Sequence, residues 1–149
     1  MNCISCKKPN NENLITVTKF WSVTLSSNQS YLGRSYVTLK RHCGSLSELE
    51  LNEWLDFIDL TKKLESAYKK AFDATMFNWT CLMNNTYQEV PPNPHIHWHF
   101  RPRYNHDVDV NGKQFNDQEF GHHYSREREQ SIDSAVKETV LIKIKGNLL

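Results

Sequence analysis

The chain has 149 residues, the length of a single domain, and no repeat, low-complexity run or Gly/Ser linker divides it. Its 18 Lys and Arg residues nearly balance its 17 Asp and Glu residues, which leaves a formal net charge of +1. This balance argues against a protein that coats nucleic acid, since such a protein needs a sustained positive field. We therefore predict one domain over 1–149 and expect no nucleic-acid partner.

The N-terminal segment and the cysteines bear on the cellular compartment. The start of the chain has no apolar stretch of signal-peptide length, and no window approaches the ~18 apolar residues of a membrane span. The 4 cysteines are too few for a disulfide scaffold in a chain of this size. We expect reduced thiols in a cytoplasmic protein without a membrane partner.

Cys3 and Cys6 form a Cys-x-x-Cys pair, which can serve metal ligation or redox chemistry. A redox pair is expected near a βαβ pattern, opening a helix. Here residues 7–11 follow with the composition of a turn. Metal ligation is therefore the better functional interpretation of the pair.

The first half of the chain predicts two strands and a long helix. Residues 14–25 are rich in β-branched and aromatic types and predict one strand, and 34–41 predict a second. Ser45 and Glu48 have the S-x-x-E form of a capping box. Apolar residues then recur at near-helical spacing and predict one amphipathic helix over 48–72.

The second half predicts further strands over 76–83 and over 95–101, the latter closed by Pro102. Between them, 84–94 predicts an irregular loop, because it holds three prolines and two adjacent asparagines. A short strand is expected over 106–110.

Apolar residues near the C-terminus predict a final helix that stops near Gly146. They are Ile132, Val136, Val140, Leu141 and Ile144. Antiparallel strands with a long helix on one face predict an α+β domain.

Three of the 7 histidines fall in the five residues from His95 to His99. Because side chains alternate along a strand, we expect these imidazoles to point the same way, roughly 6.6 Å apart along the strand. The opposite face is apolar, as a side that faces the core should be. It holds Ile96, Trp98 and Phe100.

Two chemistries fit this row of histidines. In the first, two or three neutral imidazoles hold a metal ion that keeps an open position, as in zinc hydrolases. In the second, the middle imidazole, that of His97, attacks phosphorus, since a neutral histidine is a competent nucleophile and afterwards a good leaving group. Arg101 and Arg103 would lend positive charge to a phosphate site.

The segment from His95 to Tyr104 resembles the signature of the histidine triad (HIT) family, His-φ-His-φ-His-φ-φ followed by Pro-Arg, where φ is apolar. The stretch from Leu32 to His42 resembles the family's segment from the hairpin glycine to Lys-x-His. The resemblance covers about residues 3–124 and leaves 125–149 as a C-terminal helical extension. Within the family, the segment from Phe77 through His99 is closest to a bacterial branch of diadenosine tetraphosphate hydrolase-like proteins, and the stretch 107–124 also resembles that branch.

The resemblance implies a fold and an activity. The fold is an antiparallel five-stranded sheet with one long helix, joined to a second copy as a homodimer with a ten-stranded sheet. The activity is attack on the α-phosphate of an adenosine nucleotide, either a dinucleoside polyphosphate or a nucleoside phosphoramidate. His97 would form a nucleotidyl-histidine intermediate, His99 would bind phosphate oxygens or the leaving group, and Asn84 would position the substrate.

The resemblance also implies a nucleoside cleft, for which Trp21 and Leu25 are candidate base contacts. Ser26 stands where many members carry an Asp that binds the ribose. The residues 90–94 replace a Gly-Gln-Ser/Thr whose hydroxyl assists the leaving group, with Asn93 as a candidate substitute donor. Arg101 is expected to contact the substrate phosphates.

A subset of the family carries a structural zinc, and the resemblance extends to its four ligand positions. They are Cys3, Cys6, His42 and His95. Two sulfurs and two nitrogens suit a closed tetrahedral zinc site. No organic cofactor is expected.

Two other functions remain open from the sequence. One is a nucleotide-binding HIT module without catalysis, which the missing hydroxyl favours. The other is a metal-dependent hydrolase that uses the histidine row as ligands. His106, His122 and His123 lie outside the row and are expected on the solvated surface.

Overall fold

The computed structural model describes residues 3–6 and 9–148. Its centre is a five-stranded antiparallel sheet in the order β1-β2-β3-β5-β4. The strands are β1 (Leu14–Val17), β2 (Trp21–Leu25), β3 (Ser35–Leu39), β4 (Met76–Thr80) and β5 (His97–Arg103). The predicted α+β class and the five-stranded sheet are confirmed.

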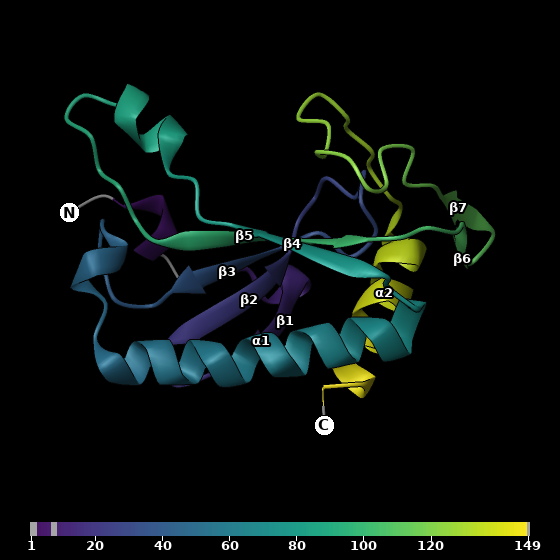
Figure 1. The fold of residues 1–149 in the computed structure, drawn as a ribbon, viewed down its shortest axis with the longest axis horizontal. Coiled ribbons are helices and arrows are strands. Elements are labelled where there is room, and N and C mark those ends of the chain that lie inside the picture. The colour runs from purple at the N-terminus through teal and green to yellow at the C-terminus, as the bar shows by residue number, and fades with distance from the viewer. Residues whose placement is uncertain (1–2, 7–8, 149) are drawn as a thin grey trace.

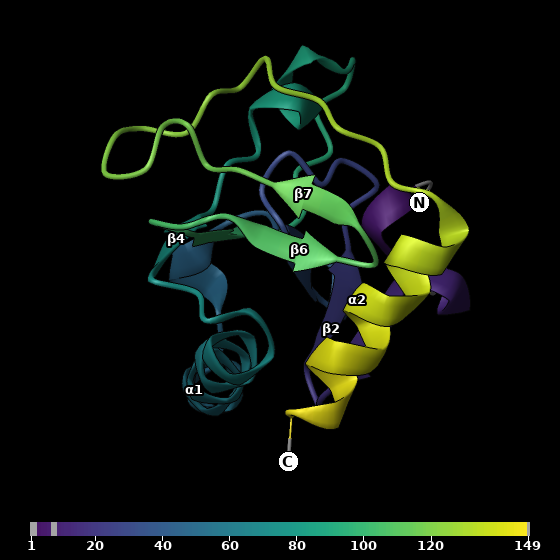
Figure 2. The same cartoon turned by 90° about the vertical axis from the view of Figure 1, so that its right-hand side faces the viewer.

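Two helices pack on the same side of this sheet (Figures 1 and 2). Helix α1 (Leu51–Phe72) runs along the sheet, and α2 (Ser134–Gly146) contacts α1 and β1. A separate hairpin of β6 (Val108–Val110) and β7 (Lys113–Phe115) also meets α2. Within the described residues, neither helix combines the length and the hydropathy that crossing a bilayer requires.

The prediction of one strand over 14–25 is wrong, because the chain turns back at Thr18 and forms β1 and β2. The Asp56 carboxylate of α1 holds this turn. It accepts hydrogen bonds from the Thr18 hydroxyl at 2.7 Å and from the Phe20 backbone N–H at 2.9 Å. The turn contains no Gly, Pro or Asn, so the local sequence carries no turn signal.

The predicted helix start is displaced by three residues. Ser45 caps a 3-10 helix over Leu46–Glu48, and α1 begins at Leu51. The Glu53 carboxylate closes the first turn of α1 by accepting the Glu50 backbone N–H at 2.8 Å. It also pairs with Arg41 at 2.8 Å, and this guanidinium holds the pKa of Glu53 below its usual value. An S-x-x-E pattern therefore caps a neighbouring short helix here.

The strand that carries the histidines differs from its prediction at both ends. It begins at His97 and continues through Pro102 to Arg103. Pairing with β3 ends where Ser35 faces Phe100, so Pro102 has a partner strand only on the β4 side. Its missing N–H therefore removes no bond to β3. β4 ends at Thr80, three residues earlier than predicted, and the loop that follows contains a 3-10 helix over Asn84–Gln88.

The core lies between the helices and one face of the sheet. It is made by buried side chains of α1 (Phe57, Leu60, Leu64, Tyr68 and Phe72), of α2 (Val136, Val140, Leu141 and Ile144), of the sheet (Val23, Val37 and Phe100) and of Ile96, just before β5. The rings of Trp98 and Phe57 stack with centroids 5.0 Å apart. The apolar face predicted for β5 is thus packed on α1, which leaves His97 and His99 on the opposite face.

Gly33 tests the packing between this core and the turn before β3. Its φ is +80°, and a Cβ at this position would lie 2.3 Å from the ring of buried Tyr68. Gly33→Ala should lower the free energy of unfolding by about 3 kcal/mol or more, from backbone strain plus overpacking. Gly112→Ala is the control, because its φ is +78° and no atom lies within 4 Å of its added Cβ. It should cost only about 1 kcal/mol. Equal melting temperatures for the two variants would contradict the packing argument.

Candidate active site

His97 and His99 lie on the exposed face of β5 with ring centroids 5.0 Å apart. Tyr36 of β3 is the cross-strand partner of His99, and its ring meets the His99 ring edge-on at 5.2 Å. His95 precedes the strand and is buried. Its imidazole contacts cysteine side chains instead of the other two rings of the row. The predicted row of three histidines is therefore divided between two sites.

The backbone fixes the tautomer of His97. Its Nδ1 lies 2.8 Å from the carbonyl oxygen of His95. A carbonyl oxygen only accepts hydrogen bonds, so the ring donates from Nδ1 and carries its lone pair on Nε2. A neutral imidazole oriented in this way is a nucleophile.

His99 is held in its neutral form. Burial lowers the pKa of His99 to about 4, and the nearby charges of His97 and Arg101 act in the same direction. Its Nδ1 is buried and has no hydrogen-bond partner among the described residues. At neutral pH this ring can bind a phosphate oxygen through one N–H, but it is a poor source of a proton.

Four potential metal ligands converge beside the start of β5. The ligand atoms of Cys3, Cys6, His42 and His95 all lie within 4.8 Å of one another. Sγ of Cys3 is 3.4 Å from Nδ1 of His95, and Sγ of Cys6 is 3.3 Å from Nδ1 of His42. The two Nδ1 atoms are 3.2 Å apart. A tetrahedral zinc with its usual bond lengths separates such ligand atoms by about 3.4–3.6 Å. The cluster therefore has the dimensions of a zinc site.

The hydrogen bonds of His95 also suit a metal ligand. Its Nε2 lies 2.6 Å from the carbonyl oxygen of Leu39, to which it must donate. The lone pair therefore sits on Nδ1, which faces the two sulfurs. Burial lowers the pKa of His95, so this nitrogen stays unprotonated. Two imidazole nitrogens and two thiols that meet in this way are compatible with zinc.

A cleft of about 450 Å³ opens on the polar face of the sheet, beside Tyr36 and Thr38. Leu25 and Ser26 border this cleft, and both side chains are largely buried. The opposite wall is the N-terminal segment, through Ser5, Pro9, Asn10 and Asn13. The metal-ligand cluster and the cleft therefore share one segment of the chain.

The prediction that Trp21 contacts the base of a nucleoside is wrong. Its side chain is fully buried, packs on Phe57 with ring centroids 5.0 Å apart, and donates its indole N–H to the carbonyl oxygen of Glu53 at 2.9 Å. Trp21 therefore belongs to the core and does not contact a base in the cleft.

The two asparagines lie on the loop before β5. Asn84 is exposed at the start of a 3-10 helix, and its amide makes no hydrogen bond to any part of the chain that the structure describes. Asn93 is half-buried in the extended segment ahead of the strand. The catalytic role of Asn84 and the donor role of Asn93 stay predictions.

Several solved structures share this fold. A hypothetical histidine triad nucleotide-binding protein from Sulfolobus tokodaii matches with a TM-score of 0.72 at 17% identity, over 98% of this chain and 91% of that one. A zinc-bound histidine triad family protein from Mycobacterium smegmatis matches with a TM-score of 0.61 at 16% identity, over 91% and 82%. The diadenosine triphosphate hydrolase of Plasmodium falciparum matches with a TM-score of 0.60 at 14% identity, over 93% and 77%. The chain has the histidine triad fold.

No protein-family model matches the sequence, and no curated protein matches it. The similarity to the histidine triad structures therefore lies in the fold, and the expected HIT-like architecture is confirmed. In this chain the fold brings the signature histidines, the cleft and the metal-ligand cluster to one side of the sheet.

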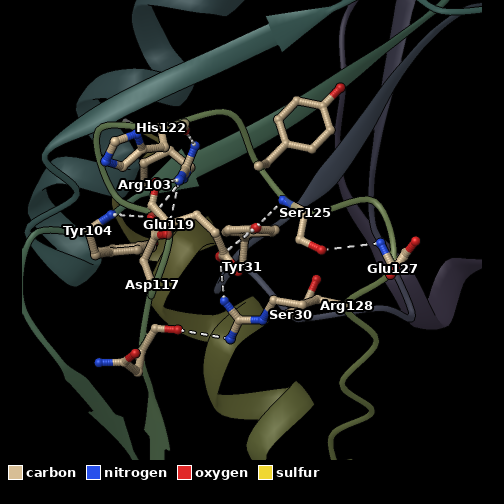
Figure 3. A network of polar contacts seen from close by, with 12 residues as sticks. Ser30, Tyr31, Arg103, Tyr104, Asp117, Glu119, His122, Ser125, Glu127 and Arg128 are labelled. Carbon is tan, nitrogen blue, oxygen red and sulfur yellow. Dashed lines mark hydrogen bonds and ion pairs between the residues drawn. The ribbon is translucent and has the colours of Figure 1, made fainter.

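Arg103 is an anchor of the histidine triad fold here and does not lie free for a phosphate (Figure 3). It is fully buried, and its N–H groups bond Asp117 twice, at 2.6 and 3.0 Å, and also Asn78 and the carbonyl oxygens of Glu119 and His122. These five bonds use all the donors of the guanidinium. The expectation that Arg103 lends charge to a phosphate site is therefore wrong.

The same network holds the segment after β7 on the sheet. The Glu119 carboxylate accepts from the Tyr31 hydroxyl at 2.9 Å and from Arg128 at 2.8 Å, as Figure 3 shows. The segment carries Tyr124, whose ring centroid lies 3.9 Å from the Arg101 guanidinium. The sequence alone does not identify Tyr124 or Tyr36 as site residues, because their contacts with Arg101 and His99 are made between segments that are distant in the chain.

The side chains of the other three histidines lie outside these contacts. His122 and His123 are exposed, as expected. His106 is half-buried, with its ring edge-on to Tyr104 at a centroid distance of 6.0 Å.

The buried pair of Arg103 and Asp117 gives a test of the anchor. Asp117→Asn removes the negative charge but keeps the shape, so the guanidinium loses its counter-ion in the interior. The free energy of unfolding should fall by about 3–5 kcal/mol. Asp59→Asn is the control, since Asp59 pairs with Lys62 on the surface at 4.0 Å, and it should leave the melting temperature unchanged within about 2 °C. Thermal unfolding measures both; an equally mild effect of Asp117→Asn would mean that water reaches this arginine.

Proposed function

We propose that the chain is a HIT-family nucleotidyl hydrolase that attacks the α-phosphate of an adenosine nucleotide through His97. One observation carries the proposal: the His95 carbonyl binds Nδ1 of His97, which leaves the Nε2 lone pair available next to neutral His99. The sequence signature supports the same assignment, as do neighbours that include a nucleotide-binding protein and a diadenosine triphosphate hydrolase.

The reaction has two steps. Nε2 of His97 bonds to the α-phosphorus while the bond to the leaving group breaks, and water then hydrolyses the phosphorus–nitrogen bond. His99 donates one hydrogen bond to a phosphate oxygen. Leu25 and Ser26 contact the nucleoside in the cleft, and Asn84 and Asn93 approach the substrate from the loop before β5.

A metal-dependent hydrolase that uses the row as ligands fits the geometry less well. A catalytic metal needs an open position. The four-ligand cluster takes His95 out of the row and has a closed ligand set. The nucleotide-binding module without catalysis differs from the proposal only in turnover, so a measurement of hydrolysis distinguishes the two.

His97→Ala tests the mechanism. The variant should lose at least about 10³-fold in kcat on a diadenosine polyphosphate, because no other group replaces the nucleophile. His106→Ala should keep wild-type activity, since this ring packs on Tyr104. Mass spectrometry of the wild-type protein, quenched during turnover, should find an adenylyl adduct on His97. A fully active His97→Ala enzyme would overturn the proposal, and tight nucleotide binding without any turnover would favour the non-catalytic module.

We further propose that Cys3, Cys6, His42 and His95 hold a structural zinc. When bound, the metal would join the N-terminal segment to the start of the catalytic strand. The chain's own contribution is to keep the His95 imidazole neutral and to turn the Nδ1 atoms of both histidines toward the sulfurs.

Cys6→Ser should reduce the zinc content from about one ion per chain to nearly none, because it removes one of four ligands. A chelator should lower the melting temperature of the wild-type protein and leave that of Cys6→Ser unchanged. Cys81→Ser is the control, since Cys81 lies outside the cluster. Elemental analysis decides the matter: equal zinc in wild type and Cys6→Ser would exclude this site.

The homodimer stays a prediction. β4 is an edge strand of the sheet, as the ten-stranded arrangement requires. Helix α1 exposes Leu51, Leu55 and Ile58, which recur at the spacing of one helix face.

A further inference from the structure

Arg34 and Arg101 face each other next to the catalytic histidines. The pairing of β3 with β5 ends at Ser35 and Phe100. Arg34 and Arg101 occupy the next pair of opposite positions, Arg34 just before β3 and Arg101 within β5. Because side chains alternate, they lie on the face that carries Tyr36 and His99. Arg101 is 6% exposed and Arg34 is half-buried. Two positive charges are thus brought together in a mostly buried place.

Neither arginine has a counter-ion among the described residues. Arg101 stacks on Tyr124 and makes one long hydrogen bond, 3.5 Å, to the hydroxyl of Thr80. Arg34 makes one of the same length to the hydroxyl of Tyr36, and its Nε is buried without a partner. Burial, and the charge of Arg34 after it, lower the pKa of Arg101. Like charges opposite each other in a sheet are destabilising, so an anion between them would remove a cost.

The position of the pair relates it to the reaction. Along β5, Arg101 lies two residues beyond His99, which corresponds to about 6.6 Å. A phosphate bound at His97 and His99 would therefore have its next phosphates within reach of both guanidinium groups. Arginine is suited to this task, because its planar fork binds two phosphate oxygens at once.

The groups around the leaving group discriminate between two substrate classes. An amine leaving group must gain a proton as the phosphorus–nitrogen bond breaks, whereas a phosphate leaving group gains negative charge. Residues 90–94 contain no hydroxyl and no titratable side chain. Burial lowers the pKa of His99 to about 4, and the neutral ring is a poor source of a proton. Residues 90–94 and His99 therefore supply no good proton donor, whereas the two arginines supply positive charge.

We propose that Arg34 and Arg101 bind the phosphates of the leaving group and make the enzyme selective for nucleoside polyphosphates over nucleoside phosphoramidates. This inference rests on the proposed role of His97. As Nε2 bonds to the α-phosphorus, the bond from that phosphorus to the bridging oxygen breaks. The electron pair stays on the departing phosphate, and the two guanidinium groups neutralise the added charge.

The experiment compares diadenosine tetraphosphate with adenosine 5′-phosphoramidate as substrates for Arg34→Met and Arg101→Met. Each variant should lose about 10- to 100-fold in kcat/KM on the tetraphosphate, the usual effect of removing a charged hydrogen bond. Activity on the phosphoramidate should change by less than about 3-fold. Arg126→Met is the control, because Arg126 is exposed, and it should retain both activities. Equal losses on both substrates, or no loss on either, would overturn the inference.

A binding measurement keeps the test decisive if Arg101→Met fails to fold. Calorimetry with inorganic tripolyphosphate and the His97→Ala protein should give one site per chain, weakened at least about 10-fold by adding Arg34→Met. Absence of tripolyphosphate binding would overturn the inference. A wild-type enzyme that prefers the phosphoramidate would also overturn the inference, but it would leave the proposed role of His97 unaffected. Full activity of His97→Ala would instead remove the proposed function itself.

Discussion

The arrangement of this site depends on His95, which bonds through three different atoms. Its carbonyl oxygen binds Nδ1 of His97, its Nε2 donates to the carbonyl oxygen of Leu39, and its Nδ1 faces Cys3 and Cys6. Each bond determines a property of the site: the tautomer of His97, the connection of His95 to β3, and the free lone pair of His95 in the cluster. A shift of this residue would change all three, because they share one rigid backbone unit and one ring.

The cleft is placed by the same connection. Its inner wall is the polar face of β2 and β3, and its outer wall is the N-terminal segment on either side of Cys6. Among the described residues of this outer wall, none is a buried apolar side chain, so a metal in the cluster would be its main attachment. A metal at this point would therefore serve the cleft as well as the stability of the chain.

Much of this could be predicted from the sequence where the signal is local or periodic. The long helix has a clear helical period, and β5 has the alternation of a strand. The histidines at every second position also mark the strand on which they lie. The turn between β1 and β2 could not be predicted, because Asp56 makes it from a position 38 residues away from Thr18. Side-chain alternation restarts after a turn. The face of the sheet on which Trp21 lies could therefore not be predicted without knowing where this turn is. Arg34 becomes a neighbour of Arg101 only through strand register, which a single sequence does not reveal.

Arg101 and Arg103 show how the fold separates a balanced charge from an unbalanced one. Both lie on the same face of β5, two residues apart, and both are buried. Arg103 has a carboxylate and all five of its donors bonded, so its charge is balanced within the chain. Arg101 has one long hydrogen bond and a second arginine opposite it. A net charge of +1 hides this contrast, because it sums over balanced and unbalanced groups alike. A field that attracted an anion to this face would therefore come from the few cations that the fold leaves without a partner among the described residues.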